Sequence, residues 1–306
     1  MIGGKNDDLN GLICVNKPQG FTSFDVIAKM RGILRLRRLG HAGTLDPMAT
    51  GVLPVFVGKA TKACDIIPDH DKTYRAGFRL GFVSDTQDSS GKMTELGGAE
   101  KVTAEKLEAS LCDFRGDIMQ IPPMYSAVTV NGKRLYDLAR KGIEVEREAR
   151  PVTIYKLVLT DFDEASHEGT LEISCSRGTY IRTVINDIGE KLGCGAVMTS
   201  LVRTAACGFS LSDCVSLEEL QANADSGNSA GKYLLPIEKV FADYPSVKLD
   251  EHREKLYRNG VKLKIELMGG CIKCGGIHRV FGADGGFIGL GIANAETMEF
   301  TVYKNF

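Results

Sequence analysis

The sequence predicts an α+β fold with a mixed or antiparallel central sheet and a small β-rich domain at the C-terminus. Segments with helical spacing and segments with strand-like spacing alternate irregularly along the chain. The sequence lacks the Gly-rich phosphate loop of a dinucleotide or nucleoside triphosphate site. Beyond residue 244, short apolar runs are separated by glycines, which is typical of strands and turns. We therefore expect a larger domain at residues 1–235 and a smaller one at residues 244–306.

The composition is that of an ordinary globular protein. Of the 306 residues, 43% are hydrophobic and 25% are charged, so the chain can bury a sizeable core. The first residues show no charged-then-apolar leader, and no apolar run approaches the roughly 20 residues that a membrane helix requires. These observations predict a cytoplasmic protein that has no contact with a membrane.

The N-terminal part of the chain carries the clearest local signals. An apolar run at residues 12–15 predicts a strand that ends in a turn at Lys17-Pro18. Thr22 can cap the helix that follows, because Asp25 stands three residues on and apolar residues recur at helical spacing. By the same criteria we expect strands at residues 52–57, 74–80 and 171–176, helices at 103–113 and 181–192, and a flexible connection at 221–231.

Residues 121–150 differ from their surroundings. They begin with prolines, continue through an Asn-Gly turn signal and end in alternating charges. This pattern indicates an exposed excursion from the core, and the name excursion is kept for residues 121–150 below. Six cations there are available to contact a partner: Lys133, Arg134, Arg140, Lys141, Arg147 and Arg150.

Charge is distributed unevenly along the chain, although the net charge is only −1. Residues 17–62 contain eight Lys or Arg but only two acids, Asp25 and Asp46, a local excess of six positive charges. Such a concentration suits phosphate binding, but a solvated helix face balanced by acids elsewhere also explains it. Charge alone favours the solvated face.

Nine cysteines, most of them scattered singly, do not form the framework of a disulfide-rich secreted protein. Cys271 and Cys274, with His278 nearby, could suggest zinc. A tetrahedral site needs four ligands and usually a second closely spaced pair, so we expect no metal site.

The stretch GHAGTLDPMATGVLPVFVGKATK, residues 40–62, contains Asp46. An Asp before Pro often only begins a turn, by bonding its own backbone. Here the surrounding residues are small enough for another molecule to approach the backbone, His41 lies five residues earlier, and a basic segment precedes both. This combination predicts a place that can hold a nucleotide.

This stretch resembles the signature of the TruB family, the bacterial tRNA pseudouridine-55 synthases. Four further segments resemble the family in the same order: GLICVNKPQGFTSFDV, DKTYRAGFRLGFVSDTQDSSG, IPPMYSAVTVNGKRLYDLARKGIEVEREARPV, and SRGTYIRTVINDIGEKLGCGA followed by LVRTAACGF. The resemblance covers about residues 10–210 and implies a pseudouridine synthase-like catalytic domain. Beyond it, DGGFIGLG weakly implies a PUA-like RNA-binding domain. The implied reaction isomerises uridine 55 in the T-loop of tRNA to pseudouridine, after the base has been flipped out.

The resemblance identifies Asp46 as the nucleophile, Tyr74 as the active-site tyrosine and Arg182 as the arginine that pairs with the aspartate. A carboxylate can attack C1′ of the sugar, add to C6 of the base or stabilise positive charge on the sugar, and the sequence does not choose among these routes. The tyrosine could stack on the uracil and take part in proton transfer. The implied reaction is an isomerisation with no net oxidation or reduction and no transfer of a group from another molecule, so it is expected to need no cofactor and no metal.

Four further residues match positions that contact the substrate. His41 would fill the space that the extruded base leaves in the T-loop. Tyr180 and Leu201 would line the uracil pocket, although each could also be an ordinary core residue. Lys17, together with the excursion, would hold the sugar-phosphate backbone of the RNA.

Two alternatives to a stand-alone enzyme remain. One is a tRNA-folding chaperone that opens the elbow of tRNA, with chemistry secondary or absent. The other is a guide-RNA-directed relative of the same fold, which the absence of long Lys-rich tails disfavours. The retained Asp46, Tyr74 and Arg182 favour catalysis. We therefore expect a monomer that binds the T-arm of tRNA without a guide RNA.

Overall fold

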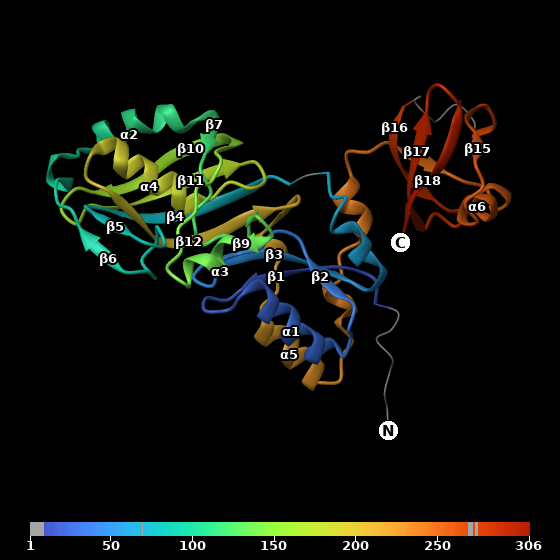
Figure 1. The fold of residues 1–306 in the computed structure, drawn as a ribbon. Coiled ribbons are helices and arrows are strands. Elements are labelled where there is room, and N and C mark those ends of the chain that lie inside the picture. The colour runs from blue at the N-terminus through green and yellow to red at the C-terminus, as the bar shows by residue number, and fades with distance from the viewer. Residues whose placement is uncertain (1–8, 69, 269–271, 273–274) are drawn as a thin grey trace.

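A nine-stranded mixed sheet forms the centre of the larger domain (Figure 1). The computed structural model describes residues 9–68, 70–268, 272 and 275–306. The strands run in the order β1-β3-β12-β4-β11-β10-β7, with β2 and β13 beside β3 and β12; only β3 and β12 are parallel among these pairs. Their bounds are β1 (Gly11–Lys17), β2 (Leu39–His41), β3 (Thr50–Val57), β4 (Lys72–Leu80), β7 (Gly116–Gln120), β10 (Arg150–Asp163), β11 (Glu168–Cys175), β12 (Ala196–Ala206) and β13 (Phe209–Ser210).

Two pairs of helices cover different parts of this sheet. Helix α1 (Ser23–Leu34) packs with α5 (Leu217–Asp225) against β1 and β3, whereas α2 (Ala104–Leu111) packs with α4 (Ile181–Leu192) against the part built from β4, β10, β11 and β12. The predicted capping box of α1 is confirmed, since the Thr22 hydroxyl accepts from the Asp25 N–H and the Asp25 carboxylate accepts from the Thr22 N–H. Gly193 ends α4 in the left-handed conformation, as a C-terminal glycine commonly does.

The predicted flexible connection at residues 221–231 is wrong in its first half, because residues up to Asp225 belong to α5. Ser216 caps this helix, and Leu217, Leu220 and Asn223 turn a buried face toward α1 and β1. The Asn223 amide also donates to the carbonyl oxygens of residues 228 and 229, which fixes the polar turn that follows. Tertiary packing has therefore ordered a stretch whose composition suggested a linker.

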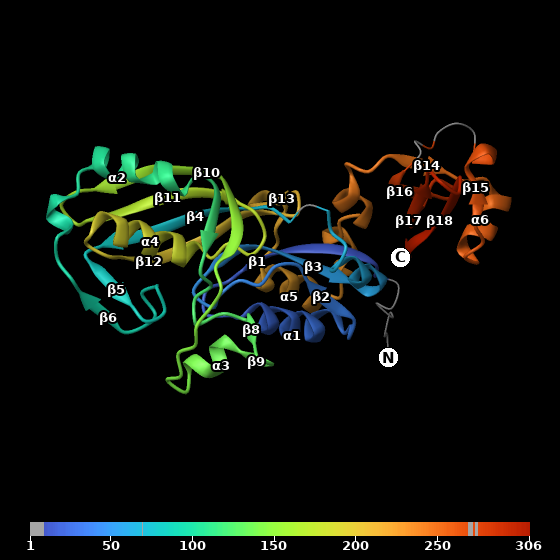
Figure 2. The ribbon, with the colours of Figure 1, turned by 45° about the horizontal axis from the view of Figure 1, so that its top comes forward.

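The excursion stands away from the body of the sheet (Figure 2). It contains a short hairpin, β8 (Thr129–Val130) and β9 (Lys133–Arg134), followed by α3 (Leu135–Ala139). Asn131 and Gly132 both have positive φ, as the hairpin turn predicted from Asn-Gly requires. Another two-stranded hairpin, β5 (Phe82–Ser84) with β6 (Met93–Glu95), follows β4.

The C-terminal domain contains a five-stranded sheet in the order β14-β16-β17-β18-β15, so the β-rich prediction is confirmed. Its strands are β14 (Ser246–Lys248), β15 (Leu263–Lys264), β16 (Gly276–Phe281), β17 (Phe287–Asn294) and β18 (Glu299–Asn305). The sequence analysis missed α6 (Glu251–Arg258), which Asp250 caps and whose Tyr257 is buried in the domain core. Cys271 and Cys274 lie outside the described residues, so the structure does not test their part in a zinc site.

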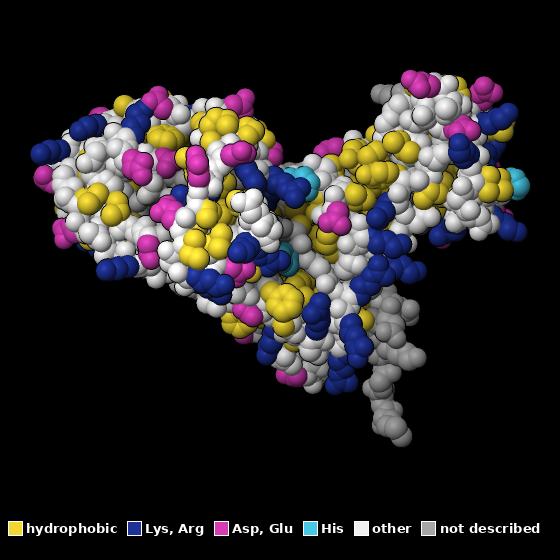
Figure 3. Space-filling model, in the orientation of Figure 1, with side chains coloured by type: hydrophobic (Ala, Val, Ile, Leu, Met, Phe, Trp, Pro, Cys, Tyr) yellow, Lys and Arg dark blue, Asp and Glu magenta, His cyan; other side chains and the backbone are white. Residues whose placement is uncertain are grey.

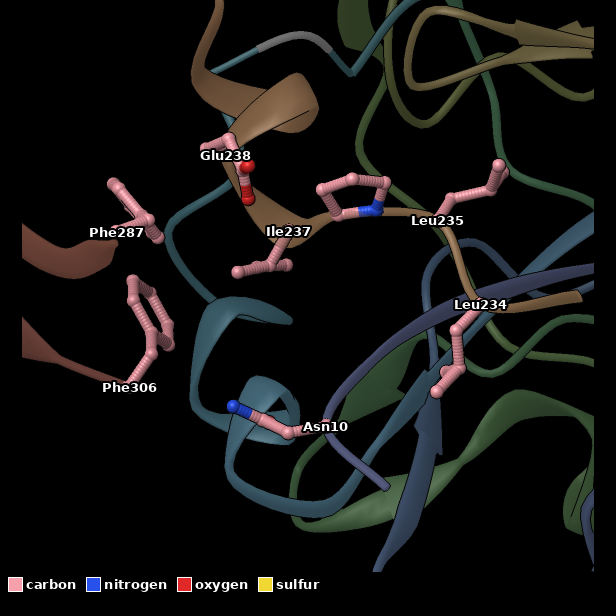
Figure 4. A pocket seen from close by; sticks show the side chains of 8 residues that line it. Asn10, Leu234, Leu235, Ile237, Glu238, Phe287 and Phe306 are labelled. Carbon is pink, nitrogen blue, oxygen red and sulfur yellow. The ribbon is translucent and has the colours of Figure 1, made fainter. Parts of the chain in front are cut away.

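Aromatic side chains join the two domains. Phe241 stacks on Tyr244, Phe287 and Phe306, with ring centroids 5.8–6.5 Å apart. A cavity of about 360 Å³ lies beside this stack, lined by residues from both domains, including Asn10, Glu238 and Phe306 (Figure 4). No residue with a predicted catalytic role lines it. Within the described part of the chain, no helix is long and apolar enough to cross a membrane.

Candidate active site

Asp46 lies in the loop between β2 and β3, and buried neighbours hold that loop in place. Leu45 and Ala49 belong to the core that also contains Tyr74 and Leu201. The buried Ser23 hydroxyl accepts from the Leu45 N–H at 2.9 Å and donates to its carbonyl oxygen at 3.3 Å. The Ala49 N–H closes the turn on the Asp46 carbonyl at 3.0 Å. The Asp46 carboxylate itself remains 41% exposed, so it can meet a substrate from outside.

Lys17 is buried against the loop that contains Asp46, contrary to its predicted role as a phosphate contact. Its side chain is fully buried, and its ammonium donates to the carbonyl oxygens of Pro18 (3.0 Å), Phe21 (2.5 Å) and Pro47 (3.4 Å). Burial lowers the pKa of Lys17 to about 8, while the negative charge of Asp46 acts in the opposite direction. Because the ammonium donates its hydrogen bonds to carbonyl oxygens of the protein backbone, it is not available to RNA in this arrangement.

Arg182 pairs with two carboxylates. One terminal nitrogen, Nη1, lies 3.2 Å from Asp46 Oδ2 and 3.8 Å from Asp88 Oδ2, and the other, Nη2, donates to the Tyr125 carbonyl oxygen in the excursion. Only 7% of the Arg182 side chain is exposed. A planar guanidinium held from several directions can fix the orientation of the Asp46 carboxylate.

Asp88 is a residue that the sequence analysis missed. It is 3% exposed and accepts hydrogen bonds from Ser90 and from the Thr86 hydroxyl, so its carboxylate is held firmly beside Arg182. The signal was present, since Asp88 lies within the family-like segment that begins at Asp71. A single sequence did not reveal that this acid folds back onto the arginine.

Tyr74 lies opposite Arg203 in the antiparallel pairing of β4 with β12. Burial raises the pKa of Tyr74 to about 12, although the nearby Arg203 guanidinium acts to lower it. The phenol is therefore protonated at neutral pH. Arg203 is fully buried, and it donates to the carbonyl oxygens of Val52 at 2.7 Å and Gly43 at 3.0 Å. These bonds tie β12 to the Asp46 loop, a role that no sequence pattern indicated.

The other predicted site residues, Tyr180, Leu201 and His41, differ in their contacts and in how deeply they are buried. The Arg182 guanidinium carbon lies 5.8 Å from the centroid of the Tyr180 ring. Leu201 is 7% exposed and packs in the core with Leu45 and Tyr74. His41 ends β2 opposite Val55, and burial, followed by the charge of Arg203, lowers its pKa. His41 therefore presents a neutral ring at physiological pH.

Positive charge gathers beside the site. Figure 3 shows Lys and Arg side chains over the N-terminal part of the chain, where α1 and β2 lie in Figure 1. In the excursion, the guanidinium carbons of Arg134 and Arg140 lie 5.9 and 5.4 Å from the centroid of the Tyr136 ring. The exposed cations at residues 29–62 are Lys29, Arg35, Arg37, Arg38, Lys59 and Lys62. Among the described residues, no group of three or more His, Cys, Asp or Glu is arranged to hold a metal ion.

Comparisons with known proteins show the family to which the chain is similar. The family described as "TruB family pseudouridylate synthase (N terminal domain)" matches residues 31–181, and "tRNA pseudouridylate synthase B C-terminal domain" matches residues 182–242. The tRNA pseudouridine synthase B of Clostridium tetani is 44% identical over 288 residues, which are 94% of this chain and 97% of the relative. The corresponding protein of Clostridium kluyveri is 42% identical over 299 residues, 97% of this chain and 100% of the relative.

Solved structures also match. A chain from the crystal structure of a Cbf5-Nop10-Gar1 complex superposes with a TM-score of 0.70 at 26% identity, covering 94% of this chain and 80% of that one. A chain from an H/ACA RNP bound to a substrate RNA gives a TM-score of 0.71 at 24% identity, covering 97% of this chain and 84% of that one. These matches establish that the mixed sheet and the C-terminal β domain form a known fold.

Proposed function

The chain belongs to the TruB family of pseudouridylate synthases, and from this premise we propose that it isomerises uridine 55 in the T-loop of tRNA. As a member of that family it is a tRNA pseudouridine synthase, an isomerase. The position of the uridine and the residues that act on it are the proposal. The observation that carries it is the half-exposed Asp46 carboxylate held 3.2 Å from the buried Arg182 guanidinium.

Asp46 acts on the flipped nucleotide. The reaction must break the bond between N1 of uracil and C1′ of ribose, turn the base and form a bond from C5 to C1′. A carboxylate assists by attack at C1′, by addition at C6 or by stabilising a sugar cation, and all three need an oriented anion beside the nucleotide. Arg182 provides that orientation, and Asp88 pairs with the same terminal nitrogen of Arg182, Nη1.

Tyr74 takes part in proton transfer as a neutral phenol. Because its pKa is raised to about 12, the hydroxyl keeps its proton at neutral pH and can donate it to the detached uracil. The phenolate that results can then take up the proton that leaves C2′ or C5. Tyr74 packs in one core with Leu201 and Leu45, whose apolar side chains suit a stacked uracil. Tyr180 and Leu201 complete the proposed uracil pocket.

Extruding a uridine from a folded loop costs a few kcal/mol of lost stacking. The neutral ring of His41 offsets part of this cost by occupying the vacated space in the T-loop. Exposed cations of the excursion contact the sugar-phosphate backbone, and we propose a similar role in RNA binding for the PUA-like domain at residues 244–306. The catalytic domain spans residues 1–235 in this proposal, and the protein acts as a monomer without a guide RNA.

The proposed function is tested with unmodified tRNA that carries tritium at C5 of uridine. The purified protein should release tritium and form pseudouridine at position 55, and an isolated T-arm stem-loop should also react. The same nucleotides in an unpaired strand should react poorly, since the loop must present its shape to the site. Pseudouridine at another position, or equal rates on folded and unpaired RNA, would contradict the proposed substrate.

A further inference from the structure

Gln120 is a buried amide that makes two hydrogen bonds to a single backbone unit. Its side-chain oxygen accepts from the Tyr180 N–H at 2.8 Å, and its side-chain nitrogen donates to the Tyr180 carbonyl oxygen at 3.1 Å. The residue is 2% exposed. A primary amide can satisfy both an N–H and a C=O in this way, whereas a carboxylate can only accept.

The position of Tyr180 makes this contact consequential. Tyr180 precedes the first residue of α4, and no side chain caps the helix from this position. Arg182 is the second residue of the same helix, so the orientation of the Tyr180 backbone sets the direction in which both side chains point. The bonds from Gln120 therefore fix the start of the helix that carries the partner of Asp46.

The same contact joins that helix to the base of the excursion. Gln120 is the last residue of β7, and it pairs with Arg150, the first residue of β10, so this pair closes the excursion. Five residues after Gln120, the Tyr125 carbonyl accepts from Arg182. One end of the Tyr180–Arg182 segment is thus bonded to Gln120, the residue just before the excursion, and the other end to Tyr125 within it.

We propose that Gln120 is a positioning residue for the isomerisation. It holds the Tyr180 backbone so that Arg182 meets Asp46, and it makes that alignment depend on the base of the excursion. This inference rests on the proposed function, because the excursion is the proposed RNA contact. Gln120 does not touch the substrate, so its loss slows the reaction without weakening RNA binding.

The test uses the full-length chain with Gln120→Met, which keeps length and removes both hydrogen bonds, and Gln120→Glu, assayed at pH 8, which keeps the acceptor and removes the donor. Gln221→Met is the matched control, since the Gln221 side chain donates to Asp225 within α5, a helix that does not carry Tyr180 or Arg182. Three quantities are measured: the single-turnover rate at saturating tRNA, the Kd for tRNA and the melting temperature.

Both Gln120 variants should lower the single-turnover rate by about tenfold or more, because a misplacement of about 1 Å in a catalytic group can cost roughly 100-fold in rate. Their Kd should stay within about twofold of the unmutated value, and Gln221→Met should change neither quantity. A folded variant with an unchanged rate, or a rate loss that tracks weaker binding, overturns the inference. If both variants melt below the assay temperature, Gln120 serves stability alone and the inference also fails. An unmutated protein that forms no pseudouridine would instead refute the proposed function.

Discussion

Lys17→Met separates two roles for a lysine next to the Asp46 loop. A lysine that contacts an RNA phosphate contributes to the salt dependence of binding, because its contact releases counterions. The buried Lys17 ammonium instead bonds three carbonyl groups of the protein. We therefore expect Lys17→Met to leave the salt dependence of tRNA binding unchanged and to reduce stability and turnover.

The pH dependence of the stability effect follows from the pKa of Lys17. The value falls from 10.5 to about 8 on folding, and each factor of ten in proton affinity is worth about 1.4 kcal/mol, so the difference amounts to roughly 3 kcal/mol. Because the folded pKa lies below the unfolded one, the unfolded chain binds more protons between about pH 8 and 10.5, and stability rises with pH in that window. A methionine does not titrate, so the loss of unfolding free energy caused by Lys17→Met should grow by roughly 3 kcal/mol from pH 7.5 to 10.5.

Urea unfolding at several pH values measures the effect of Lys17→Met on stability, and tRNA binding across a salt series measures its effect on the salt dependence of binding. Lys133→Met in the excursion is the matched control, because Lys133 is exposed and its removal should reduce the salt slope by about 1. A salt slope that falls equally in Lys17→Met would show that Lys17 contacts phosphate. A stability difference that stays constant with pH would refute the reasoning about its burial.

Three further predictions concern residues around Asp46. Asp88→Asn should lower the single-turnover rate about tenfold with unchanged Kd, because it removes the second anion 3.8 Å from Arg182; a normal rate would show that Arg182 is oriented without that anion. Tyr74→Phe should abolish most turnover, and the rate of the unmutated enzyme should show no phenol titration below about pH 10, since the pKa of Tyr74 is about 12; such a titration in a pH–rate profile would contradict this. Gly51→Ala should cost about 3 kcal/mol or more in urea unfolding, because its φ is +104° and a Cβ would lie 2.2 Å from the Arg203 carbonyl oxygen; an unchanged midpoint would show that the backbone can yield.

Local signals in the sequence predicted local structure well. The capping box at Thr22, the Asn-Gly hairpin turn and the glycine stop at Gly193 all formed as expected, because each depends on residues within a few positions of one another. The polar stretch after residue 220 misled the analysis, since only packing against α1 distinguishes its helix from a linker.

The site was predictable as a set of residue types and less so as an arrangement. Resemblance to a family drew attention to Asp46 and Arg182, and the structure places them in contact. The buried state of Lys17 and the supporting roles of Asp88 and Arg203 depend on strand pairing across long sequence distances, which no short window contains. For this reason Lys17 was expected to contact the RNA backbone, and no supporting role was expected for Asp88 or Arg203.

The most direct test of the account replaces the Asp46 carboxylate alone. Asp46→Asn keeps the size of the side chain and removes its negative charge, whereas Asp161→Asn makes the same change at an exposed position on β10. Single-turnover tritium release and tRNA binding should be measured for both variants and the unmutated protein. We predict that Asp46→Asn binds tRNA and releases no tritium above background, while Asp161→Asn reacts normally. Turnover by Asp46→Asn near the unmutated rate would contradict the claim that this carboxylate carries out the isomerisation.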